Sequence, residues 1–69
     1  MIVVRLSETV FDFNDRIRCI DLFSFVANKQ LSKVWHKGSI DFTFKSDHDA
    51  TLFLLKFGGE VIDKQQQTV

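Results

Sequence analysis

The residues with the clearest chemical potential form a short cluster, Asp47, His48 and Asp49. Carboxylate and imidazole groups this close together could bind a divalent metal ion. The same residues also suit the start of a helix, where short polar side chains cap free amide groups and acids complement the helix dipole. We favour the capping role, and we expect no metal ion and no cofactor.

Two other positions could take part in catalysis, but the groups that catalysis requires do not accompany them. His36 and Asp41 can meet across an expected hairpin, yet a His-Asp pair without a nucleophile is not a catalytic set. Cys19 falls on the apolar side of an expected helix, which favours a buried structural thiol over a reactive one. We therefore expect a protein that is not an enzyme.

Composition narrows the classes of partner. The 69 residues include nine basic and nine acidic side chains, and this balance argues against a protein that holds nucleic acid mainly through its phosphates. A single cysteine fits a reducing, cytoplasmic setting, and no apolar stretch has the length of a membrane span. A chain this short builds a small core, so oligomerisation or a partner is a common source of added stability.

The stretch from residue 37 to residue 60 organises the expected fold. Its first part alternates apolar Ile40, Phe42 and Phe44 with polar residues, which predicts a half-buried strand. Ser46 or Asp47 then caps a helix that ends at two glycines. The inward side of this helix is expected to contain Ala50, Phe53, Leu54 and Phe57.

A second strand and helix precede this stretch. Residues 2–6 are rich in β-branched side chains, which predicts a strand. Asn14 or Asp12 could cap a helix that runs to about Asn28. Helical spacing places a broad apolar stripe on this helix, formed by Cys19, Ile20, Leu22, Phe23, Val26 and Ala27.

Residues 31–36 form a further expected strand, joined to the next by a tight turn at Lys37 and Gly38. A two-residue turn pairs Trp35 with Ile40 and directs both side chains to the core. A slip of one residue in this register would instead move Trp35 to the open face of the sheet.

The resulting order is strand, helix, strand, strand, helix and short strand. It predicts an α+β protein with the ferredoxin-like split β-α-β pattern: a four-stranded antiparallel sheet with two helices on one face. The strands that begin near Ile2 and Ile40 are expected at its centre. The last strand, at Val61 and Ile62, is short or absent. We expect one domain over residues 1–63 and a polar, flexible tail over residues 64–69.

Residues 37–62 resemble part of an RNA-recognition motif. Lys37 and Gly38 match the opening of that family's strand signature, and Phe42 and Phe44 match its apolar and last aromatic positions. Ser39 and Asp41 stand where the family has the rings that stack on bases. The resemblance therefore implies the fold without the usual RNA contacts. The ending of the chain also resembles small uncharacterised proteins of tailed phages, which implies a short accessory protein.

Apolar residues left outside the expected core supply the main functional hypothesis. We expect a protein-protein interaction module that forms a homodimer, or that binds and modulates another protein. Its interface would contain Ile17, Phe25, Leu52 and Leu55. The alternative is a regulator that binds RNA or single-stranded DNA on the open face of the sheet. That face would use Arg5, Trp35, His36, Lys37 and Lys45.

Overall fold

Six elements follow one another in the order that the sequence predicts. The structure is a computed structural model, and it describes residues 1–64. The elements are β1 (Ile2–Ser7), α1 (Arg16–Lys29), β2 (Ser32–His36), β3 (Ser39–Phe44), α2 (Asp47–Phe57) and β4 (Glu60–Lys64).

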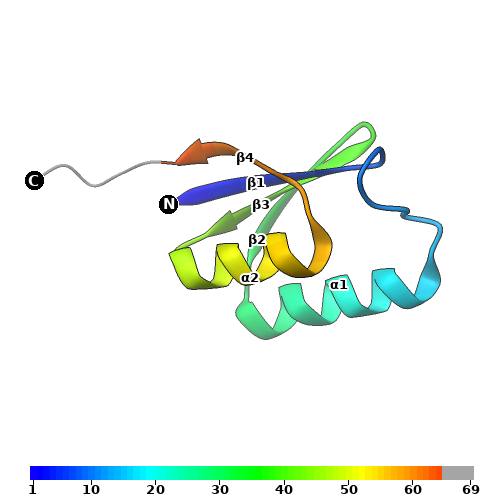
Figure 1. Cartoon of the computed structure of the whole chain (residues 1–69), viewed down its shortest axis with the longest axis horizontal. Helices are drawn as coiled ribbons and strands as arrows, with labels where there is room; N and C mark the ends of the chain where they lie inside the picture. The colour runs from blue at the N-terminus through cyan, green and yellow to red at the C-terminus, as the bar shows by residue number, and fades with distance from the viewer. Residues whose placement is uncertain (65–69) are drawn as a thin grey trace, which may run out of the picture.

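The strands form one antiparallel sheet in the order β2-β3-β1-β4. Both helices lie on the same face of this sheet, as Figure 1 shows. The predicted central strands, β1 and β3, are confirmed, and so is the ferredoxin-like α+β arrangement. The other face of the sheet carries no helix of residues 1–64. The strand order leaves β2 and β4 as the two edges.

The core fills the space between the sheet and the helices. Alternation along β1 and β3 sends every second side chain towards the helices. Phe53 of α2 lies at the centre, with its ring centroid 5.1 Å from that of Phe42 and 5.3 Å from that of Phe44. The fully buried side chains are Val4, Leu6, Phe11, Leu22, Ile40, Phe42, Phe44 and Phe53.

Both helices begin at a capping side chain, but the cap of α1 differs from the prediction. Ser46 caps α2, since its Oγ accepts a hydrogen bond from the Asp49 amide at 3.3 Å. Asp15 caps α1, where its Oδ1 accepts from the Arg18 amide at 3.2 Å. The prediction of Asn14 or Asp12 is wrong, because Asp12 accepts a bond from the amide of Asn14 and closes the turn before the helix.

The apolar stripe predicted for α1 is partly wrong. Leu22 and Val26 are buried, whereas Ile20 is 62% exposed and Ala27 is also exposed. Phe25, which the stripe left out, packs against the core. Periodicity gives the width of a stripe, but the position of the neighbouring helix decides which flank becomes covered.

The closing strand is present and longer than the sequence suggests. β4 pairs with β1, and Lys64, which we expected in a tail, lies opposite Ile2. The register of this pair shifts between Val3 and Val4, so β4 is irregular. The rest of the expected tail, residues 65–69, lies outside the described residues.

Candidate functional site

The exposed tryptophan is the most unusual surface feature of the described chain. The predicted hairpin register is confirmed, with Trp35 of β2 opposite Ile40 of β3. Trp35 therefore points to the helix side of the sheet, yet its side chain is 60% exposed. Our expectation of a core tryptophan is wrong, because β2 lies at the edge of the sheet and α1 covers only part of it.

Trp35 is held in place by an aromatic ring of α1. The ring centroids of Trp35 and Phe23 lie 6.0 Å apart, and the two planes differ by 27°, which is a stacked arrangement. Such a pair contributes about 1 kcal/mol beyond the area that it buries. Stacking leaves the outer surface of the indole open and restricts its rotation.

Exposed apolar residues of α1 extend this surface. Ile20 and Ala27 share a helix flank with Phe23, because they lie three residues before it and four after it. Ile20, Phe23, Ala27 and Trp35 together form what we call the tryptophan ledge. The helical stripe and the hairpin register predict all four residues in the core. Lys33 is a signal against this, since a lysine two positions before Trp35 on the helix side of β2 indicates an uncovered strand.

The ledge borders an edge strand of regular geometry. β2 pairs with β3 in one unbroken register from Ser32 to His36. No strand of residues 1–64 pairs with the other side of β2. An edge of this kind can accept another strand, whereas the bulge makes the edge at β4 a poorer template.

The charge around the ledge is mainly positive. Residues 32–38 contain Lys33 and Lys37 and no acid, while His36 contacts Asp41 on the open face. Arg16 shares the flank of α1 with Ile20, four residues away. The nearest acid along the turn is Glu8, whose backbone amide donates to the carbonyl of Gly38 at 2.9 Å.

The open face of the sheet is organised around one carboxylate. Asp41 is only 8% exposed, although no helix covers this face. Its two oxygens accept hydrogen bonds from Arg5 Nε and Nη2 at 2.8 and 2.9 Å. Oδ2 also lies 3.0 Å from His36 Nε2, so the predicted contact between His36 and Asp41 is confirmed.

The ion pair between Arg5 and Asp41 shifts the pKa of both groups. The pKa of Asp41 lies below its ordinary value, chiefly because its carboxylate accepts the hydrogen bonds of Arg5, while burial acts in the opposite direction. The pKa of Arg5 is raised, chiefly by the same hydrogen bonds. The Nε and Nη2 groups of Arg5 are thus occupied by Asp41 and are not free to bind a phosphate.

The residues predicted for nucleic-acid binding do not gather on one surface. Arg5 and His36 both contact Asp41, whereas Trp35 lies on the helix side. Lys37 is in the hairpin turn and Lys45 follows the far end of β3, about 20 Å away by the rise of a strand. On the open face, Arg5 and His36 already contact Asp41, and the strands of residues 1–64 place no phenylalanine or tryptophan ring there on which a base could stack.

The four residues predicted for a helical interface differ in exposure. Phe25 points inward, with its ring centroid 5.9 Å from that of Phe53 and 5.8 Å from that of Phe57. Leu52 is half-buried, while Ile17 and Leu55 are 80% and 78% exposed. Ile17 lies eight residues before Phe25, or about 12 Å along α1.

The polar cluster at the start of α2 has structural partners. Asp49 Oδ1 lies 3.3 Å from Lys29 Nζ of α1 and 3.7 Å from His48 Nδ1. Asp47 and Asp49 occupy the first turn of the helix, as capping requires. Within the described part of the chain, no group of three or more His, Cys, Asp or Glu side chains is placed to hold a metal ion. Cys19 is half-buried, and its thiol donates to the carbonyl of Phe13 at 3.3 Å.

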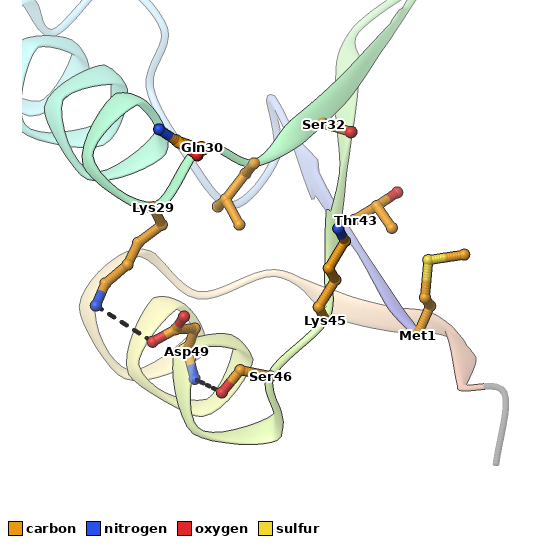
Figure 2. Close-up of a pocket in the computed structure, with 9 residues that line it drawn as sticks. Met1, Lys29, Gln30, Ser32, Thr43, Lys45, Ser46 and Asp49 are labelled. Carbon is orange, nitrogen blue, oxygen red and sulfur yellow. Dashed lines mark hydrogen bonds and ion pairs between the residues drawn. The ribbon is translucent and has the colours of Figure 1, made fainter. Parts of the chain in front are cut away.

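A shallow hollow of about 280 Å³ lies where α1 leads into β2 and β3 leads into α2 (Figure 2). The ion pair between Lys29 and Asp49 spans one side of it, and Lys45 lies across from that pair. The rest of the lining consists of Met1, Gln30, Leu31, Ser32, Thr43 and Ser46. Opposite charges and mixed polarity give this hollow no clear preference for a ligand.

Comparison with known proteins returns no matching family model, no matching curated protein and no matching solved structure. The likeness to RNA-recognition motifs is therefore limited to the α+β architecture, and the likeness to phage proteins has no support. Among residues 1–64, no helix is both long and apolar enough to cross a membrane.

Proposed function

We propose that the chain is a non-enzymatic, cytoplasmic module that binds another protein through the tryptophan ledge. The observation that carries this proposal is the exposure of Trp35, 60%, in a position fixed by stacking on Phe23. Tryptophan is enriched among the residues that dominate binding energy at protein interfaces. A ring that is already ordered loses little conformational freedom on binding.

Two features support the ledge over the interface predicted from the sequence. The ledge joins Trp35 and Phe23 by ring contact, whereas Ile17 and Leu55 are exposed residues of two different helices. In addition, Phe25 is engaged with α2 and contributes to the fold. Symmetric self-association through the four predicted residues thus has less support than contact through the ledge.

Site-specific photo-crosslinking tests the proposal. A benzophenone side chain replaces Ile20 or Ala27 in separate full-length variants, one helical turn from the Phe23 that contacts Trp35. Matched controls carry the same group at Ile17 or Leu55, which are also exposed and more so than Ile20. Each variant is irradiated in extract of the cells that make the protein, and adducts, including those between two copies, are identified by mass.

The proposal predicts discrete adducts from the ledge positions, lost when Trp35→Ala is added, and few from the controls. Adducts from Ile17 and Leu55 alone would instead support the interface on the helices. The absence of adducts at all four positions would count against an interaction module.

A further inference from the structure

We propose that the edge of β2 receives an extended, acidic segment of another protein as an added strand, with an apolar side chain of that segment against Trp35. This inference rests on the proposed function and specifies the class of partner. Addition of a strand to a sheet edge is a general mode of peptide recognition, in which the main chain supplies affinity and alternate side chains supply specificity.

The backbone of β2 suits an added strand. It follows one register with β3 over its whole length, from Ser32 to His36, and it has no strand on its outer side in residues 1–64. All five of its residues are exposed. β4 lacks this regularity because of its bulge, so the two edges of the sheet are not equivalent.

Alternation along β2 fixes the pattern that the segment would need. Lys33 and Trp35 lie on the helix side, since they are opposite Phe42 and Ile40, which are buried in the core. Side chains of adjacent strands pair with those directly opposite. A segment beside β2 therefore places one side chain next to Lys33 and another, two positions away, next to Trp35. An acid suits the first position and a large apolar residue suits the second.

The same charges disfavour a second copy of β2 as the occupant. Two copies of β2 can pair antiparallel, with the helices of both copies on the same side of the sheet, around a two-fold axis at Lys33, Val34 or Trp35. These registers place Lys33 directly opposite a lysine of the copy or diagonal to one. Like charges in such positions destabilise a sheet, and an edge lysine is a common protection against self-pairing. An acidic side chain on the added segment would instead attract Lys33.

A single-stranded nucleic acid is the competing class of ligand, because lysines beside an aromatic ring also suit it. The protein segment is favoured by the surroundings of Trp35. One side of its ring is occupied by Phe23, and Arg5 on the open face is bound to Asp41. A nucleic acid could stack on only one ring here, that of Trp35, and it would make no use of the backbone groups along the edge of β2.

Nuclear magnetic resonance of the ¹⁵N-labelled full chain provides the test. One probe is a short capped peptide with the central sequence Glu-Val-Leu-Thr-Glu. It has an acid two positions before and two positions after its leucine, so it offers the required pattern in either strand direction. A second peptide replaces both acids by lysine, and a third replaces the threonine by proline to remove a backbone donor. A single-stranded RNA of mixed sequence is the fourth probe.

We expect the acidic peptide to shift the amide signals of β2 and the indole signal of Trp35, with weaker binding of the lysine and proline peptides. Lys33→Glu should weaken the acidic peptide about fivefold and favour the lysine peptide. Lys64→Glu is the matched control, since it makes the same charge change on β4 at the opposite edge of the sheet, and it should leave the affinity unchanged.

Other outcomes overturn the inference. These are indifference to the charge of the peptide, shifts centred away from β2, or no shift from any peptide at millimolar concentration. Shifts of β2 by the RNA alone would assign the surface to nucleic acid. Adducts from the ledge in the crosslinking experiment would still support a protein-binding module if the peptides failed, so the two proposals can fail separately.

Discussion

At the scale of single residues, the surface contains two groups of interacting side chains, one aromatic and one charged, and we assign them different roles. Trp35 and Phe23 stack at the surface, where a partner can reach them. Arg5, His36 and Asp41 satisfy one another on the open face. We infer that the first group serves binding and that the second stabilises the sheet by joining β1, β2 and β3.

The group around Asp41 predicts a pH dependence of stability. Because the folded pKa of Asp41 is lowered, its ionised form stabilises the fold in full above the ordinary aspartate pKa of about 4. That contribution is lost as the pH falls below this value and through the folded pKa. Asp41→Asn should therefore lower the urea midpoint clearly at pH 7 and less at acidic pH.

Urea denaturation of both proteins at several pH values measures this difference. Asp21→Asn, at an exposed position of α1, controls for the loss of one negative surface charge. A difference between Asp41→Asn and the parent that stays constant, or that grows in acid, would show that the ion pair does not stabilise the sheet.

At the scale of the elements, local signals explain where helices begin and where strands can approach. The alternation of Ile40, Phe42 and Phe44 gives β3, and Ser46 starts α2 immediately afterwards. Gly59 has a φ of +111°, and a Cβ atom there would lie 2.9 Å from the carbonyl oxygen of Arg5. The passage from α2 to β4 thus depends on a residue without a side chain.

Ser46→Ala tests the cap of α2. The change removes the Oγ that accepts a bond from the Asp49 amide, so we expect a loss of about 1 kcal/mol in the free energy of unfolding. Ser24→Ala is the matched control, because Ser24 is exposed on α1 and alanine is the better helix former. An equal loss from both variants would contradict the capping role.

Gly59→Ala tests the close approach of the chain to β1. We expect a loss of about 2 kcal/mol, because the added methyl group meets the backbone at Arg5 in a conformation that alanine adopts poorly. Gly38→Ala should cost about half as much, since its φ is also positive but the nearest atoms belong to the movable side chain of Glu8. Chemical denaturation of both variants makes the comparison, and a larger loss at Gly38 would refute it.

At the scale of the whole molecule, the sequence predicts what depends on neighbours along the chain. Strand alternation, the hairpin register at Trp35 and Ile40, and the ferredoxin-like order all follow from local patterns, and all are confirmed. The exposure of Trp35 does not follow, because it depends on where α1 crosses the sheet. The inward position of Phe25 likewise depends on the distance between two helices that are remote in sequence.

Because the core is small, substitutions at buried and exposed positions of α2 should differ strongly in their effect on stability. Phe53→Ala removes the ring at the centre of the core and should cost about 4 kcal/mol. That is a large part of the stability of a domain of this size, which is roughly 3 to 10 kcal/mol. Leu55→Ala, two residues away and exposed, should change stability by about 0.5 kcal/mol or less. Thermal unfolding followed by circular dichroism measures both, and similar losses would contradict the assigned core.

The central claim is that Trp35 is an exposed anchor of the surface. It is the single tryptophan of the chain, so the fluorescence of the dilute folded protein and its quenching by acrylamide report on this residue alone. We predict emission close to that of the unfolded chain, together with efficient quenching. Blue-shifted, protected emission at the lowest concentration, which moves to the red only on unfolding, would place Trp35 in the core and contradict the account.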